Sequence, residues 1–196
     1  IRKKIRKVKK KNKMINFEKQ NSFINTLEFS LTDDQIKSLK EINKDLNSTN
    51  KMFSLLQGDV GSGKTIVALI AALNTIRSGY QVAVMAPTEI LARQHYNLAK
   101  KLFPSNTNIE FISGKSKYTT KKKITDKLKK DEIDIIFGTH AIFQKNIIFK
   151  NLGLIIIDEQ HKFGVNQRKK LSDKGGVECD VLLMTATPIP RTLTMT

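Results

Sequence analysis

The fold of this chain is decided by one stretch, residues 58–65, which read Gly-Asp-Val-Gly-Ser-Gly-Lys-Thr. A glycine, four variable residues and then Gly-Lys-Thr form the pattern of a phosphate-binding loop. The glycines permit backbone angles that a Cβ forbids, so successive N–H groups can converge on phosphate oxygens. Residues 52–57 before the loop predict a buried strand, and the apolar residues 66–73 after it predict a helix. We therefore expect phosphate to bind at the N-terminus of that helix.

The loop positions have separate tasks. Lys64 is expected to supply a mobile cation for the outer phosphates, and Thr65 a hydroxyl for Mg²⁺. A chance glycine-rich surface turn is the alternative, but the strand and the helix on either side disfavour it. The predicted nucleotide contacts in the loop are Gly58, Asp59, Val60, Gly61, Ser62, Gly63, Lys64 and Thr65.

A second motif is acidic. Residues 154–161 read Leu-Ile-Ile-Ile-Asp-Glu-Gln-His, an apolar strand that ends in two carboxylates. Open α/β sheets bind their ligands at the carboxyl ends of the strands. Asp158 is expected to hold Mg²⁺ and Glu159 to orient the water that attacks the γ-phosphate. With Lys64 they are the predicted catalytic residues; two solvated acids at a strand end are the simpler alternative.

Together with further blocks, these motifs resemble the superfamily 2 helicases and translocases. Residues 158–161 are similar to the Asp-Glu-x-His box of that superfamily, and its motif Ia, strand-contacting loop and motif III resemble residues 86–95, 138–141 and 185–193. Residues 58–65, 85–95 and 157–168 resemble more narrowly the RecG family of bacterial branch-migration helicases. The transcription-repair coupling factor Mfd is the alternative, from which Ser62, Glu89 and Gln160 distinguish this chain.

The resemblance implies an ATP-dependent DNA helicase or translocase that uses ATP and Mg²⁺. Its expected partner is DNA, as branched junctions and forks, in branch migration, replication-fork regression and recombinational repair. It also implies a second RecA-like domain and a wedge domain that are missing here. We expect residues 1–30 to be a basic arm and linker, residues 31–196 to be the first RecA-like domain, and the fragment to be weakly active or inactive.

The resemblance also assigns roles to single residues. Gln35 is similar to an adenine-recognising glutamine, and Phe29 is placed to pack on the base. Thr32 and Gln35 also form a helix capping box. Gln35 cannot cap the helix and bind adenine at once, and capping alone would explain it. The expected coupling residues are His161, Thr185, Thr187 and Arg191. The expected DNA contacts are Thr88, Arg93, Gly114, Thr139 and His140, although Arg93 equally suits a plain surface position.

Strand and helix patterns alternate along the chain. Strands are predicted at 52–57, 81–86, 108–113, 133–137, 154–157 and 181–184, helices start near 32, 66, 88 and 118, and residues 17–29 are expected to connect. This alternation predicts an α/β fold of the RecA-like P-loop NTPase type, with a mainly parallel sheet and helices on both faces. A small kinase or GTPase has no use for motifs Ia and III, and the chain has no Asn-Lys-x-Asp guanine motif. A binding module that has lost catalysis is disfavoured by the intact loop lysine and acidic pair.

The net charge of +17 favours a polyanionic partner, although the many Lys, Asn and Ile residues are also typical of an AT-rich genome. The cationic block at residues 1–13 is interpreted as a phosphate contact, a linker or a solvated arm, and residues 121–123 as a solvated face. The single cysteine, Cys179, cannot form an internal disulfide. With no bilayer-spanning run and no signal core, we expect no membrane partner and no secretion. The resemblance implies a cytoplasmic, nucleoid-associated bacterial protein.

Overall fold

The computed structural model describes residues 10–159 and 179–186. Within these residues, six parallel strands form one sheet in the order β1-β6-β5-β2-β4-β3. The strands are β1 (Phe53–Gln57), β2 (Gln81–Met85), β3 (Ile109–Ile112), β4 (Ile135–Gly138), β5 (Leu152–Ile157) and β6 (Asp180–Thr185). The helices are α1 (Phe17–Ile24), α2 (Asp33–Leu46), α3 (Lys64–Arg77), α4 (Glu89–Leu102), α5 (Tyr118–Lys129) and the short 3-10 helix η1 (His140–Phe143).

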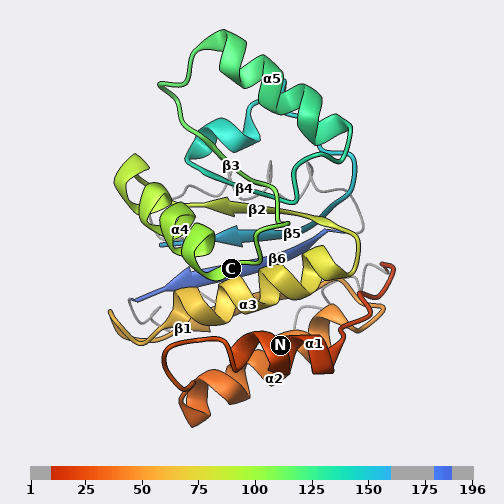
Figure 1. The fold of residues 1–196 in the computed structure, drawn as a ribbon, viewed down its shortest axis with the longest axis vertical. Helices are drawn as coiled ribbons and strands as arrows, with labels where there is room; N and C mark the ends of the chain where they lie inside the picture. Colours follow the sequence, from red (N-terminus) through yellow and green to blue (C-terminus); the bar gives the residue numbers. More distant parts are fainter. Residues whose placement is uncertain (1–9, 160–178, 187–196) are drawn as a thin grey trace, which may run out of the picture.

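Helices cover both faces of the sheet, as the sequence predicted (Figure 1). Side chains alternate along each strand, so Val82 and Val84 of β2 face one core while Ala83 and Met85 face the other. The first core is filled from α1, α2, α3 and α4, and the second from α5 and η1. Burial on both faces explains why the strands are nearly continuous runs of apolar residues.

Helix α2 begins as its sequence predicted. The Thr32 side chain accepts a hydrogen bond from the Gln35 backbone N–H at 3.3 Å, and the Gln35 side chain accepts one from the Thr32 N–H at 2.9 Å. This reciprocal pair satisfies two backbone donors that the first turn leaves open. The expected capping box is therefore confirmed.

The prediction of a simple connection over residues 17–29 was wrong, because Phe17–Ile24 forms helix α1. The Asn16 side chain caps this helix by accepting from the Lys19 N–H at 2.9 Å. Phe23 packs edge-on against the Phe103 ring with centroids 6.2 Å apart. Gln20 Oε1 accepts from the side-chain amides of two buried asparagines, Asn43 of α2 and Asn74 of α3, so α1 is fastened to both helices.

The interpretation of residues 1–13 as a solvated arm or a phosphate contact was wrong for Lys10 and Lys13. Both side chains are buried, and both ammonium groups pair with Asp180 at the start of β6. Lys10 also donates to the backbone oxygens of Asp45 and Leu46 at the end of α2. The carboxylate of Asp180, which is distant in sequence, therefore holds residues 10–13 against the start of β6.

Two smaller expectations concern the rest of the fold. Cys179 is buried, and this burial raises the pKa of its thiol to about 12, which suits a structural side chain. Among the described residues, none of the helices has the length and apolarity needed to cross a membrane.

Candidate nucleotide and DNA site

The predicted site residues meet along one edge of the sheet. All six strands described here run parallel, so their carboxyl ends share that edge. The N–H of Gly58, just after β1, donates to the Thr185 oxygen of β6 at 3.3 Å. The N–H of Asp158, just after β5, donates to the Met85 oxygen of β2 at 2.8 Å. The loop, the motif III threonine and the acidic pair therefore follow three adjacent strands, β1, β6 and β5.

The loop has the backbone that phosphate binding requires. Gly61 and Gly63 have φ angles of 82° and 77°, in the left-handed region that favours glycine. Gly63 precedes α3 and has no side chain to cap it. The Ile66 N–H donates to the Gly63 oxygen at 3.0 Å, so among the described residues the N–H groups of Lys64 and Thr65 are left to an anion. Thr65 is the second residue of this helix. This backbone is compatible with the predicted phosphate site at the N-terminus of α3.

Lys64 places a positive charge inside the loop. Its Nζ donates to the backbone oxygens of Gly58 at 2.6 Å and Asp59 at 2.7 Å. Among the described residues, no carboxylate forms an ion pair with Lys64. Because its partners are neutral, the ammonium charge is not cancelled where the outer phosphates are expected.

Gln35 joins the start of α2 to the loop. While its Oε1 completes the capping box, its Nε2 donates to the Ser62 oxygen at 2.9 Å. A Cβ on Gly63 would displace this amide, so glycine there lets Gln35 reach Ser62, while the φ angle of Gly63 independently favours glycine. The Gln35 side-chain amide therefore links the N-terminus of α2 to the phosphate loop, a contact that the sequence did not indicate.

A cavity of about 610 Å³ extends from Thr32 and Gln35 to Ser62 and Lys64. Its position beside the loop and the capping box fits a nucleotide. A larger cavity, about 800 Å³, lies between α1 and α2 and contains Phe29. The two cavities share no lining residue, so we place the nucleotide in the smaller one, beside the phosphate loop.

The two acidic residues have distinct environments. Asp158 is only 9% exposed, and its Oδ2 lies 2.7 Å from Nε2 of His95 in α4. Glu159 has a φ angle of 51°, in the left-handed region, which costs about 1–3 kcal/mol for a residue with a Cβ. Strain of this kind is typical of functional sites, and here it directs the chain immediately after β5.

The residues present fit Mg²⁺. Among the described residues, no group of three or more His, Cys, Asp or Glu side chains could hold a metal ion by itself. Mg²⁺ commonly uses one or two protein oxygens together with substrate phosphates and water. The hydroxyl of Thr65 and the carboxylate of Asp158 are hard oxygen ligands of this type.

The predicted DNA contacts follow the remaining strands of the same edge. Thr88 caps α4 by accepting from the Leu91 N–H at 3.3 Å, which leaves its own hydroxyl proton to donate. Thr139 and His140 begin η1 directly after β4. Arg93 forms an ion pair with Glu89 at 2.9 Å and lies over the Phe111 ring at 4.3 Å, so a phosphate would compete with Glu89 for it. Gly114, after β3, is exposed, and a Cβ on it would meet no neighbour.

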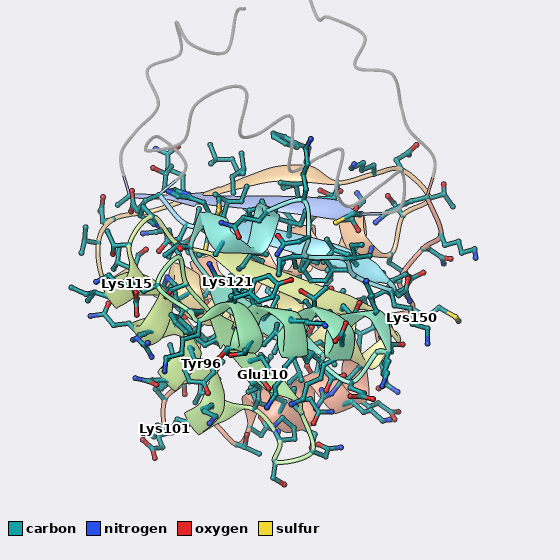
Figure 2. The ribbon with its side chains drawn as sticks, turned by 90° about the horizontal axis from the view of Figure 1, so that it is seen from above. Tyr96, Lys101, Glu110, Lys115, Lys121 and Lys150 are labelled. Carbon is teal, nitrogen blue, oxygen red and sulfur yellow. The ribbon has the colours of Figure 1, made fainter. Side chains whose placement is uncertain are left out.

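The positive charge is distributed rather than gathered in one track. Figure 2 shows Lys150 on the opposite side of the view from Lys101, Lys115 and Lys121. Lys121 donates to the Gly114 oxygen at 3.0 Å, and its neighbours Lys122 and Lys123 are exposed, in line with a solvated face. Net charge therefore does not locate a DNA path.

Of the predicted coupling residues, Thr185 ends β6 and is buried. The other three lie outside the described residues: His161, Thr187 and Arg191.

The profile described as "DEAD/DEAH box helicase" matches residues 32–196, most of the chain. This chain belongs to the DEAD/DEAH box helicase family. Two relatives are named "ATP-dependent DNA helicase RecG": one from Streptococcus pneumoniae is 52% identical over 87% of this chain, and one from Borreliella burgdorferi is 51% identical over 88%. This chain spans about a quarter of the length of each of them.

A solved structure of RecG bound to a three-way DNA junction matches 95% of this helicase chain, with a TM-score of 0.83 and 41% identity, and the match covers 25% of that protein. The UvsW helicase of bacteriophage T4 matches 90% of this chain and 62% of its own, with a TM-score of 0.65 and 16% identity, which shows the fold alone. The similarity to RecG confirms the narrower resemblance and does not favour the Mfd alternative.

Two contacts of this helicase domain were not predicted from the sequence: the bond between His95 and Asp158, and the bond between Gln35 and Ser62. His95 lies in the predicted motif Ia helix, on its buried stripe with Ala92 and Ala99. A polar side chain on an otherwise apolar helix face was the available signal, because a buried imidazole needs a partner.

Proposed function

We propose that this chain is the ATP-binding motor domain of a RecG-type, ATP-dependent DNA helicase. The observation that carries the proposal is the adjacency of β1, β6 and β5, which aligns the phosphate loop, Thr185 and the acidic pair. A loop alone would suit many nucleotide-binding proteins, whereas this ordered set suits hydrolysis coupled to movement.

Each side chain has a chemical task in this proposal. The N-terminus of α3 and Lys64 bind the outer phosphates of ATP, and Lys64 offsets their charge. Thr65 and Asp158 would hold Mg²⁺, which would offset the negative charge of the phosphates. Glu159 orients the attacking water. Gln35 contacts the adenine once its side-chain amide gives up its bond to Thr32 or to Ser62. Thr185 lies beside the loop, where a hydroxyl can respond to the γ-phosphate.

DNA lies along the other half of the edge in this proposal, after β2, β4 and β3. Thr88, Gly114, Thr139 and His140 contact the backbone of one strand, and Arg93 joins them by leaving Glu89. Hydroxyl and backbone N–H contacts hold phosphates without reading bases, as a motor that steps over any sequence requires. A second RecA-like domain completes the motor, with His161, Thr187 and Arg191 as coupling residues. A wedge domain selects forks and junctions in the bacterial cytoplasm.

ATP hydrolysis tests this function. The rate is measured with three-way-junction DNA, with linear duplex and with heparin as a polyanion that is not DNA. For this chain alone we expect a rate near background. Joined to a second RecA-like domain, it should show a low basal rate that DNA raises and heparin does not, and a loss of about 100-fold or more in Glu159→Gln. Equal stimulation by heparin, or turnover that survives Glu159→Gln, would contradict the proposal.

The adenine contact of Gln35 gives a second prediction. Gln35→Ala removes both hydrogen bonds of the Gln35 side-chain amide. Thr32→Ala removes only the capping hydrogen bond that the Thr32 hydroxyl accepts. Each variant should lose about 1 kcal/mol of stability by urea denaturation. Only Gln35→Ala should weaken ADP binding, by about three- to tenfold in a calorimetric titration. Equal ADP affinity in the two variants would show that Gln35 serves only its contacts to Thr32 and Ser62 and does not bind the adenine.

A further inference from the structure

The contact between His95 and Asp158 is short, buried and far apart in sequence. His95 Nε2 and Asp158 Oδ2 lie 2.7 Å apart, and the two side chains are 10% and 12% exposed. A carboxylate oxygen can only accept, so Nε2 carries the proton and donates it. The backbone N–H of Asp158 is fixed by Met85 at 2.8 Å. Main chain and side chain of Asp158 are therefore each held by a neighbouring element.

The bond leaves one oxygen of Asp158 available. Among the described residues, no side chain or backbone N–H donates to Oδ1 of Asp158. A donor on Oδ2 limits rotation of the carboxylate and so aims Oδ1 in one direction. Histidine and carboxylate partners that orient a metal-binding group are common in metal sites, and their loss typically weakens metal binding about 10–100-fold.

His95 connects the Asp158 carboxylate to the helix that carries two of the proposed DNA contacts. His95 lies on α4, which Thr88 caps directly after β2, and Arg93 lies on the same helix. The helix packs on β3 and β4, the strands that precede Gly114 and Thr139. If DNA binding near Thr88 shifted α4, the bond between His95 and Asp158 would transmit that shift to the carboxylate.

We propose that His95 is a positioning residue for Mg²⁺–nucleotide binding: it donates to Asp158 and sets the direction of the metal-binding oxygen. The inference rests on the proposed function, because it requires Asp158 to hold Mg²⁺. It adds a residue that contacts neither nucleotide nor metal and that acts through the carboxylate.

The test compares His95→Gln with His95→Met in this 196-residue chain. The two replacement side chains have nearly the same shape, but only glutamine has an N–H donor that can replace Nε2. Binding of a fluorescent ADP derivative is titrated at increasing Mg²⁺ and, separately, in EDTA. We expect His95→Met to need about tenfold more Mg²⁺ for half-maximal binding, His95→Gln to stay within about threefold of the parent chain, and affinity in EDTA to be unchanged.

Several outcomes would overturn the inference. An unchanged Mg²⁺ requirement in His95→Met would show that the bond does not serve the metal. An equal loss of affinity in EDTA, or loss of the fold in both variants, would make His95 a structural residue. Failure of the parent chain to bind nucleotide would instead remove the proposed function itself, and Lys64→Ala in the same titration reports on that point separately.

Discussion

Replacing Asp180 by alanine should destabilise this domain by about 3–5 kcal/mol, the usual cost of leaving buried charges without their partner. Lys10 and Lys13 both pair with Oδ2 of Asp180, and all three side chains are fully buried. Asp180 Oδ1 also accepts from the Met52 N–H at 2.7 Å, so the substitution removes a backbone partner as well. Burial lowers the pKa of Lys10, although the hydrogen bond to Asp180 opposes this shift.

Urea denaturation of Asp180→Ala measures the effect. The matched control is Glu28→Ala, which breaks an ion pair with Lys101 on the surface, where the side chains are 81% and 66% exposed. Surface pairs of this kind contribute about 0–1 kcal/mol, so this control should be nearly neutral. A loss below about 1 kcal/mol in Asp180→Ala would mean that the two lysines reach water without it. Our account of the N-terminal segment would then be wrong.

The buried ion pairs of Lys10 and Lys13 with Asp180 also connect the N-terminal segment to the proposed nucleotide site. Residues 10–13 are tied to the first residue of β6, and the last residue of the same strand is Thr185, beside the phosphate loop. A short rigid strand therefore lies between the N-terminal segment and the nucleotide edge. Asp180 is the point at which that segment is fastened to the sheet.

Local sequence predicted the fold and the phosphate loop well, because both depend on short-range patterns. The strand before residue 58, the glycines at 61 and 63 and the capping box at Thr32 are each decided by neighbours within a few positions. Continuous apolar runs such as 152–157 identify strands buried on both faces. The alternation of these elements then leaves few possible topologies.

Contacts between distant residues could not be predicted in this way. Lys10 and Lys13 belong to a run of like charges, which predicts solvent exposure, and their counter-charge is 170 and 167 residues away. His95 meets Asp158 across 63 residues. Helix α1 has only eight residues and is held by Phe103, Asn43 and Asn74, none of which is near it in sequence. In each case the fold supplies the partner.

The second large effect is expected at Lys64. Its Nζ is the charged group inside the phosphate loop, held by the Gly58 and Asp59 oxygens rather than by an acid. A hydrogen bond to a charged group contributes about 1.5–3 kcal/mol, so Lys64→Ala should weaken nucleotide binding by about 10- to 100-fold. Since Lys64 Nζ contacts only loop atoms among the described residues, the fold should remain intact. Thermal denaturation checks this point.

The central claim is that residues 58–65 form a working phosphate site, and calorimetric titration with Mg²⁺ and a non-hydrolysable ATP analogue tests it most directly. The parent chain should bind one equivalent, and Lys101→Ala, which removes the same charge from an exposed position, should bind equally well. Lys64→Ala should lose about 10- to 100-fold in affinity while it stays folded. Absence of binding by the folded parent chain, or equal binding by Lys64→Ala, would contradict the account.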